Sequence, residues 1–295
     1  MAFVGSGLSA EHYPSWTKLV NDLCERCGSP HRVNDDSHPE KFLDAAQDAK
    51  DCAENEYFSF LGETFGRPAE NTTLTYRALF TLPFDSYLTV NLDPLVAFEA
   101  RSECHRCSGG VKAFPSLDRG DIGNRTVHYL HGFIKEGTTP VDGTIVLARG
   151  EFDAAYHNGG NVMSFLMPTL ENDPIVFMGC RLREPVMREV FGICKEHQRV
   201  RQMILRQQGE RSKPPPRFIL LPIPEVKGEG GEPDQERSRS EQQEEDRRFR
   251  RMDITPVWYP APNKKHFRLR YALEELVDLK TPSTSHGWKG DSNGQ

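Results

Sequence analysis

Two glycines and two serines near the start of the sequence have the spacing of a loop that binds phosphate. Gly5, Ser6, Gly7 and Ser9 follow the short apolar run 3–4 and precede a segment with helical periodicity. Glycines let backbone N–H groups approach an anion closely, and Ser9 can add a hydroxyl at the start of the helix. The spacing fits the loose dinucleotide pattern G-x-G-x-x-A, but an ordinary glycine turn fits it too, so other residues must decide.

Three polar side chains further along are suited to binding a ligand or moving a proton. Asn91 and Asp93 stand just before Pro94, and His131 stands before a glycine. Histidine is the usual general base near neutral pH, and an amide both donates and accepts hydrogen bonds. Each also has a structural interpretation, with Asn91 and Asp93 as helix caps and His131 as a hydrogen-bonded residue at a strand end.

Strand-like and helix-like segments alternate along the chain and indicate how these residues come together. Seven segments are predicted to be strands: 3–4, 86–90, 127–130, 144–147, 175–178, 218–221 and 254–259. Helical segments between them are typical of an α/β fold with a doubly wound, mainly parallel, Rossmann-like sheet covered by helices on both faces. Ligands of such sheets bind beyond the carboxyl ends of the strands. Because Gly5, Asn91, His131 and Gly179 all follow predicted strands, we expect them to meet in one crevice.

The region after the first loop argues against a nicotinamide-linked dehydrogenase. Enzymes of that class need an acidic residue at the end of a second strand, about 20 residues after the glycines. Glu25 has that spacing but lies in a helical segment, and no strand is predicted between it and residue 86.

Composition limits the kind of partner and compartment. The chain has 295 residues, a net charge of −6 and no apolar run long enough to cross a membrane, so neither nucleic acid nor a membrane is expected as a direct partner. Its seven cysteines are an odd number, which favours reduced thiols in the cytoplasm. The pairs Cys24/Cys27 and Cys104/Cys107 lie much further apart than the about 15 to 20 residues of a compact zinc site. Since Cys24 and Cys27 continue the apolar face of a predicted helix, no metal is expected.

The chain is predicted to form a single domain over residues 1–280. Residues 225–240 combine glycine, proline and mixed charge without an apolar period, which indicates a flexible charged insertion. Residues 281–295 are expected to be a polar, disordered tail.

Taken in order, the motifs at the predicted strand ends resemble the sirtuin superfamily. The matching segments are Gly5-Ser6-Gly7-Leu8-Ser9 (G-A-G-x-S), Pro14-Ser15-Trp16 (P-S-W), Thr89-Val90-Asn91-Leu92-Asp93 (T-x-N-x-D), Leu130-His131-Gly132 (L-H-G), 145–147 with 152–156 (a strand and an aromatic segment), and Phe177-Met178-Gly179-Cys180-Arg181-Leu182 (F-x-G-x-S-L). The resemblance spans about residues 2 to 280. It is stronger to the bacterial sirtuin-like, NAD-consuming immune effectors than to the protein deacylases.

Two departures separate the chain from the sirtuin deacylases. Those enzymes carry their zinc cysteines after the L-H-G segment, whereas both C-x-x-C pairs here precede His131. They also follow the first loop with a P-D-F-R type sequence that is missing here. The resemblance therefore implies hydrolysis of NAD and no zinc-ribbon module.

Functional roles follow from this resemblance as expectations. The implied roles are a diphosphate site at Gly5, Ser6, Gly7 and Ser9, a catalytic pair of Asn91 and His131 acting on water or the ribose, a nicotinamide contact at Asp93, and room for the adenosine side at Gly179. NAD is then the substrate of a glycohydrolase that depletes NAD in antiphage defence by abortive infection. Its activity would be controlled by homo-oligomerisation or by a separate sensor such as a ring ATPase or an Argonaute-type protein. Two alternatives stay open, a regulatory module that binds NAD or ADP-ribose without catalysis, and a protein deacylase.

Overall fold

The structure is a computed structural model that describes residues 1–34, 38–67, 73–102, 109–157, 159–183, 185–208, 213–226, 232, 234–261 and 267–278. Within these residues one sheet of seven strands has the order β3-β4-β2-β1-β5-β6-β7, and every neighbouring pair is parallel. The strands are β1 (Ala2–Val4), β2 (Ser86–Thr89), β3 (Val111–Ala113), β4 (Thr126–Tyr129), β5 (Ile175–Met178), β6 (Arg217–Pro222) and β7 (Thr255–Tyr259). The predicted doubly wound, parallel α/β fold is confirmed.

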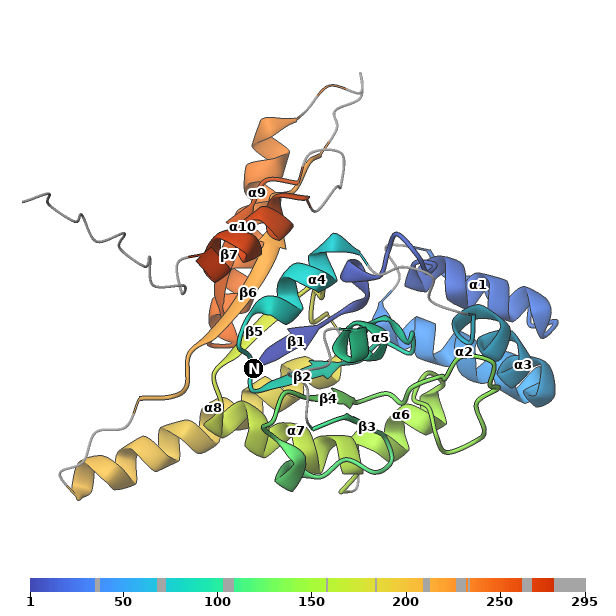
Figure 1. The fold of residues 1–295 in the computed structure, drawn as a ribbon, viewed down its shortest axis with the longest axis horizontal. Helices are drawn as coiled ribbons and strands as arrows, with labels where there is room; N and C mark the ends of the chain where they lie inside the picture. Colours follow the sequence, from blue (N-terminus) through green and yellow to red (C-terminus); the bar gives the residue numbers. More distant parts are fainter. Residues whose placement is uncertain are drawn as a thin grey trace, which may run out of the picture.

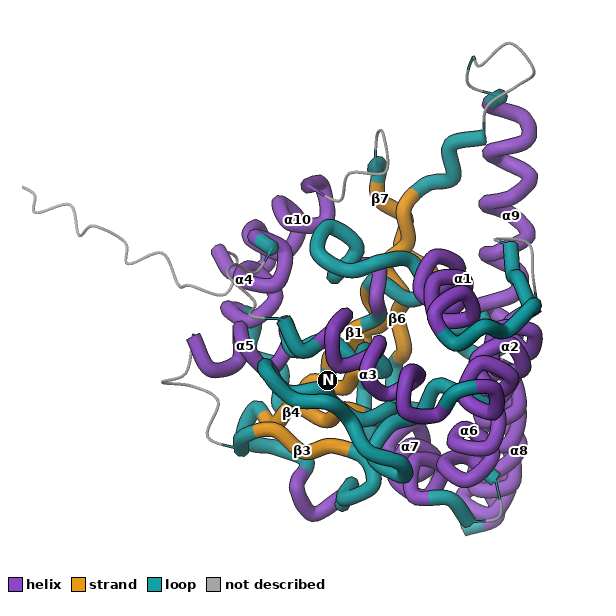
Figure 2. Tube along the Cα trace, turned by 90° about the vertical axis from the view of Figure 1, so that its right-hand side faces the viewer, coloured by secondary structure: helices purple, strands orange, loops and turns teal. Residues whose placement is uncertain are grey.

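The described helices cover both faces of the sheet, as a parallel sheet requires. They are α1 (Trp16–Arg26), α2 (Pro39–Cys52), α3 (Glu54–Phe65), α4 (Leu74–Thr81), α5 (Leu95–Ser102), α6 (Arg149–Tyr156), α7 (Asn161–Asn172), α8 (Pro185–Gln207), α9 (Gln235–Arg251) and α10 (Phe267–Asp278). Figure 2 shows α4, α5 and α10 on one side of the strands and α6 to α9 on the other. Two short 3-10 turns, Ser6–Leu8 and Arg119–Asp121, complete the described helical segments.

Alternation of side chains along β1 divides the core between these two faces. Ala2 and Val4 pack in the cluster that includes apolar residues of α4, α5 and α10. Phe3 points the other way, into the cluster formed by α6 to α9, where its ring lies 5.1 Å from that of Phe177. All three residues of β1 are buried, so this short strand forms the centre of the sheet.

Helices α1, α2 and α3 form a third buried cluster at one side of the sheet (Figure 1). Helix α1 begins at the N-cap Ser15, whose hydroxyl accepts a hydrogen bond from the Lys18 amide. Its buried face includes Cys24, and Cys27 follows directly as the C-cap. Burial raises the pKa of Cys27 to about 11, so the thiol stays protonated at neutral pH. The predicted packing role of this C-x-x-C pair is confirmed.

One predicted strand is wrong, and another was missed. Residues 144–147 are not a strand: Ile145, Val146 and Leu147 are buried in a loop, and the Val146 amide donates to the carbonyl of His131. Their β-prone, apolar character reflects burial against neighbouring helices rather than pairing in the sheet. The sheet instead extends to β3, a short and only partly buried strand at its edge.

The predicted flexible insertion is corrected in its second half. Residues 227–231 and 233 lie outside the described residues, but α9 begins at Gln235. Asp234 caps this helix by accepting the Arg237 amide, and ion pairs such as Arg250–Asp246 stabilise its exposed face. Because Phe249 is the buried residue of α9, the sequence shows no apolar period there.

Several predictions lie beyond what the structure describes. The tail 281–295, Cys104 and Cys107 are outside the described residues. No described helix is both long and apolar enough to span a membrane.

Candidate functional site

The predicted site residues follow four neighbouring strands at the carboxyl end of the sheet. Gly5 directly follows β1, Asn91 follows β2, His131 follows β4 and Gly179 directly follows β5. Strand β1 lies between β2 and β5, so the chain leaves β1 toward one side and later returns on the other. This reversal of strand order is the place where ligands bind in doubly wound sheets.

The glycines of the first loop pack directly against the loop after β5. The Gly5 amide donates to the Met178 carbonyl and the Gly7 amide to the Gly179 carbonyl, each at 2.8 Å. A Cβ on Gly5 would lie 2.5 Å from Cys180 Cβ, and one on Gly7 would lie 2.7 Å from the Gly179 oxygen. Gly179 itself has a φ of +68°, which side chains other than glycine rarely adopt. The three glycines are therefore needed for the close approach of these two loops.

This packing changes how the first loop could hold a diphosphate. The amides of Gly5 and Gly7 already donate within the protein, so the two glycines serve the contact between the loops and offer no free amide donors. The prediction that Ser9 lies at the start of the helix is wrong, because Ser9 ends a short 3-10 turn and α1 begins at Trp16. The proline and turn residues before α1 separate the two. Binding of a diphosphate by this loop stays a prediction.

A buried hydrogen-bond network joins Ser9 and Asn91 to Tyr76, a residue of α4. The hydroxyls of Ser9 and Tyr76 are 2.8 Å apart, and Asn91 Nδ2 donates to Ser9 Oγ at 3.1 Å. Ser9 is 1% exposed, Asn91 is 3% exposed and Tyr76 is fully buried. The amide nitrogen of the Asn91 side chain is thereby used within the protein, while Asn91 Oδ1 has no hydrogen-bond partner among the described residues. An unpaired buried acceptor of this kind costs free energy unless a ligand or water satisfies it.

Asp93 adds a buried carboxyl group to the same place. Its Oδ1 accepts a hydrogen bond from the Leu95 amide at 3.0 Å, which is the capping role that the sequence allowed. Burial raises the pKa of Asp93 to about 6, although hydrogen bonds from Ser9, Leu95 and Asn91 oppose this shift. The group therefore changes its charge near pH 6.

Asn91 and Asp93 line a small cavity beneath the start of α1. The cavity has a volume of about 30 Å³. Its walls are formed by Ser6, Ser9, Tyr13, Pro14, Trp16, Leu19, Phe65, Asn91, Leu92 and Asp93. A water fits in such a space, but a nicotinamide ring does not. A ligand of that size must therefore displace part of the aromatic wall that precedes α1.

His131 lies in a different set of contacts. Its Nε2 is 2.7 Å from the hydroxyl of Tyr156, while Nδ1 is buried without a partner among the described residues. Burial lowers the pKa of His131 to about 3, so the ring is neutral at physiological pH. Gly132 follows with a φ of +85°, and a Cβ there would lie 2.1 Å from the Thr144 oxygen. This glycine lets the buried loop that begins at Thr144 pack beside the histidine.

The structure thus brings the predicted residues together in part. Gly5, Gly7 and Gly179 pack against one another, whereas Ser6, Ser9, Asn91 and Asp93 line one cavity. The side chain of His131 has other partners, although Thr89 pairs with Tyr129 and so places Asn91 and His131 at equivalent positions after adjacent strands.

Two residues of the site were not predicted to take part. Nothing in its spacing singles out Tyr76, because it belongs to the apolar face of α4. Tyr156 is part of the aromatic segment quoted above, but its contact with His131 depends on the loop at 144–147.

Metal ligation has no support among the described residues. They contain no group of three or more histidine, cysteine or acidic side chains arranged to hold a metal ion. Since Cys104 and Cys107 lie outside them, the absence of a metal stays a prediction.

Comparison with known proteins gives the family. None of the curated proteins matches the chain. One solved structure, described as a Sir2 homolog–NAD complex, aligns over 95% of this chain and 88% of its own, with 14% sequence identity and a TM-score of 0.42. The family described as the SIR2-like domain matches residues 85–250, which is more than half of the chain and includes Asn91, His131 and Gly179. The chain therefore belongs to the SIR2-like domain family.

Proposed function

We propose that this chain is an NAD glycohydrolase, which cleaves the bond between nicotinamide and ribose and releases nicotinamide with ADP-ribose or a cyclised form. The observation that carries the proposal is the unpaired, buried Oδ1 of Asn91 on the wall of a cavity shared with Ser9 and Asp93. Membership of the SIR2-like family and the sirtuin-like motifs at the strand ends support it.

The chemistry suits the groups that are present. Nicotinamide leaves as a neutral molecule from a cationic pyridinium, so the enzyme must mainly orient the ribose and stabilise an oxocarbenium-like state at C1′. Asn91 Oδ1 can accept a hydrogen bond from the attacking water or a ribose hydroxyl, because its Nδ2 is held by Ser9. This arrangement fixes the acceptor before the substrate arrives.

Asp93 is assigned to the nicotinamide end of the substrate. Above pH 6 its carboxylate can accept the carboxamide N–H groups of nicotinamide and offset the positive charge of the pyridinium. Displacement of Tyr13 and Trp16 by the ring would enlarge the cavity to the required size. Gly5, Gly7 and Gly179 hold the loops after β1 and β5 together, and the diphosphate and the adenosine side are assigned to these neighbouring strand ends.

His131 is assigned the role of general base. Its neutral ring is ready to accept a proton, although a pKa of about 3 makes it a weak base in the buried state. Entry of a polar substrate beside the ring would reduce the cost of burying its charge and raise this pKa. We expect this change to accompany opening of the cavity that Asn91 and Asp93 line.

The biological role belongs to the same proposal. Resemblance to the sirtuin-like immune effectors supports NAD depletion during antiphage defence, with activity released by homo-oligomerisation or by a separate sensor protein. A sensor of the ring-ATPase or Argonaute type is the partner that this resemblance favours.

Chromatography of nicotinamide released from NAD tests the activity, with and without the product of the neighbouring gene. Asn91→Ala is expected to abolish release, and His131→Ala to reduce it by about 100-fold or more. Asn161→Ala is a matched control, because Asn161 also has an unpaired Oδ1 and an Nδ2 that donates to a carbonyl, but it lies at the start of α7. The proposal fails if the wild-type chain binds NAD and releases no nicotinamide under either condition, or if Asn91→Ala retains full turnover.

A further inference from the structure

The contact between Tyr156 and His131 is held from two directions. Besides the 2.7 Å contact between the Tyr156 hydroxyl and His131 Nε2, the two rings stand at 90° with centroids 5.7 Å apart. Phe152, one turn earlier on α6, stacks on Tyr156 at 4.5 Å and meets the edge of His131 at 6.4 Å. Tyr156 is 2% exposed, so its ring has little freedom to turn away.

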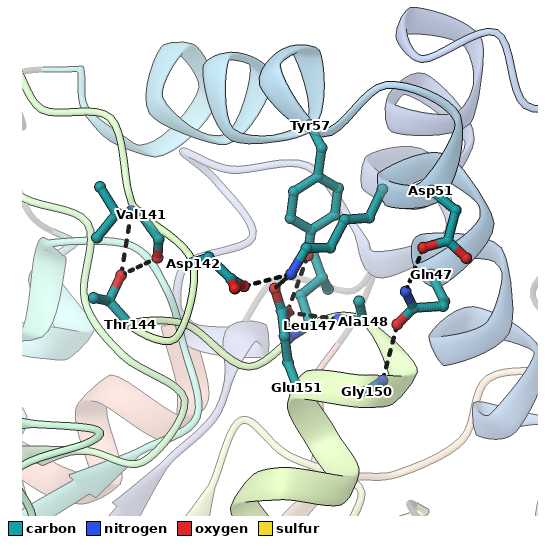
Figure 3. A network of polar contacts seen from close by, with 11 residues as sticks. Gln47, Asp51, Tyr57, Val141, Asp142, Thr144, Leu147, Ala148, Gly150 and Glu151 are labelled. Atoms are coloured by element: carbon teal, nitrogen blue, oxygen red, sulfur yellow. Dashed lines mark hydrogen bonds and ion pairs between the residues drawn. The ribbon is translucent and has the colours of Figure 1, made fainter.

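The start of α6 is fixed by a second network, centred on Glu151 (Figure 3). Glu151 Oε2 accepts the amides of Leu147 and Ala148 at 2.9 Å and the hydroxyl of Tyr57 at 3.1 Å. Its Oε1 accepts from Lys50 Nζ at 3.0 Å. These bonds tie α6 to α2, α3 and the loop beside His131, and so they fix the helix that carries Tyr156.

The unpaired nitrogen of His131 indicates which tautomer this arrangement favours. A neutral imidazole carries one proton, either on Nε2 or on Nδ1. If the Tyr156 hydroxyl donated to Nε2, the proton would sit on Nδ1 as a buried N–H without an acceptor among the described residues. Buried N–H groups without an acceptor are rarer than under-satisfied acceptors. For the imidazole, the arrangement with the smaller penalty has Nε2–H donating to the tyrosine oxygen and an open lone pair on Nδ1.

We propose that Tyr156 is a positioning residue. Its hydroxyl oxygen accepts a hydrogen bond from the Nε2–H of His131, which leaves Nδ1 as the nitrogen that takes a proton in catalysis. This inference rests on the proposed function, which gives His131 the role of base. In the step, an O–H bond of the attacking water breaks and its proton moves to Nδ1. The water oxygen bonds to C1′, and the electron pair of the C1′–N bond leaves with nicotinamide. The imidazolium then donates a charge-assisted hydrogen bond to Tyr156 and later returns its extra proton to solvent.

Loss of this bond has a kinetic signature. Hydrogen bonds to charged groups contribute enough for Tyr156→Phe to lower kcat by about tenfold to hundredfold. KM for NAD is expected to stay within about twofold, because the ring and its packing are kept. Tyr271→Phe, at an exposed position on α10, is the matched control and is expected to keep full activity.

Nitrogen NMR of ¹⁵N-histidine-labelled protein tests the tautomer without any substrate. The wild-type chain is expected to show His131 protonated on Nε2 alone, and Tyr156→Phe is expected to lose this preference. Glu151→Gln loosens the start of α6 but keeps the hydroxyl, so it is expected to lower the melting temperature while keeping the tautomer.

The possible outcomes separate this inference from the proposed function. A wild-type His131 protonated on Nδ1, or the same tautomer in wild type and Tyr156→Phe, overturns the role of Tyr156. An unchanged kcat in Tyr156→Phe does the same. Nicotinamide release that is absent from the wild-type chain, together with the expected tautomer, counts against the proposed function instead.

Discussion

Replacing Asp93 by asparagine removes a charge from the cavity and keeps the size of the side chain. Its oxygen can still accept the Leu95 amide, so the start of α5 keeps its cap. The change therefore isolates the cost of ionising a carboxyl group that is 2% exposed. It also removes the group that is assigned to the nicotinamide end, so activity and stability are expected to move in opposite directions at neutral pH.

The size and sign of the stability change follow from the pKa. Burial raises the pKa of Asp93 from 3.8 to about 6, so between these values the folded chain binds the proton more tightly than the unfolded chain. The stability that this proton gives is present in full below pH 4 and is lost as the pH rises through 6. At about 1.4 kcal/mol per pKa unit, burial of Asp93 costs about 3 kcal/mol of stability at pH 7.5, where the group is charged in both states. It costs roughly half of that at pH 5, where the folded chain keeps the group mostly protonated.

Urea unfolding of wild type and Asp93→Asn at both pH values measures this difference. Relative to wild type, the free energy of unfolding of the variant is expected to be about 1 to 2 kcal/mol higher at pH 7.5 than at pH 5. Asp118→Asn is the control, because Asp118 also accepts a backbone amide, from Gly120, but is exposed. A difference between Asp93→Asn and wild type that is the same at both pH values would refute the reasoning.

Three further changes test other parts of the structure by urea unfolding. Gly7→Ala places a Cβ 2.7 Å from the Gly179 oxygen and is expected to cost about 1 to 3 kcal/mol, with loss of NAD cleavage. Lys50→Ala leaves Glu151 buried without its cation and is expected to cost about 3 kcal/mol. His128 is fully buried, and burial lowers its pKa to about 4, so the wild type loses stability as the pH falls from 6.5 toward 4. The variant His128→Leu is expected to lose less stability over the same pH range.

Matched control variants test whether these stability changes depend on the environments of Gly7, Lys50 and His128. Gly192→Ala adds a Cβ that meets nothing within 4 Å, Lys195→Ala removes an exposed lysine, and His157→Leu removes an exposed histidine. Gly192→Ala replaces a glycine inside α8 and is expected to raise stability by up to about 1 kcal/mol, and the other two variants are expected to change it by less than about 0.5 kcal/mol. Equal losses in a variant and its control would contradict the packing or charge argument behind that pair.

Burial accounts for most of what the sequence predicted about the sheet. Strands β2 and β5 are buried runs that end at a polar or glycine residue, and such runs are read correctly because both faces of a parallel sheet are covered. The same signal misled at 145–147, where burial in a loop beside His131 produces an equally apolar run. β3 gave little signal, since an edge strand of three partly buried residues has no apolar face.

The site was predictable at the level of motifs and not at the level of contacts. Glycine and polar residues after strands give the positions of Asn91, His131 and Gly179, because parallel strands present their carboxyl ends at one edge. Partners such as Tyr76 and Tyr156 come from helices whose spacing shows only an apolar face. The loops between these elements decide which polar atoms of Asn91 and His131 stay without a partner, and the spacing of residues carries no information about those loops.

The central claim is that the chain cleaves NAD without an acyl-lysine substrate, and one measurement tests it directly. Purified protein, activated by its partner where one is required, is incubated with NAD alone and with NAD plus an acetyl-lysine peptide, and nicotinamide is quantified against the NAD consumed. The account predicts one nicotinamide for each NAD consumed at the same rate in both mixtures, and none from Asn91→Ala. Release of nicotinamide only when the peptide is present would contradict it and identify a deacylase.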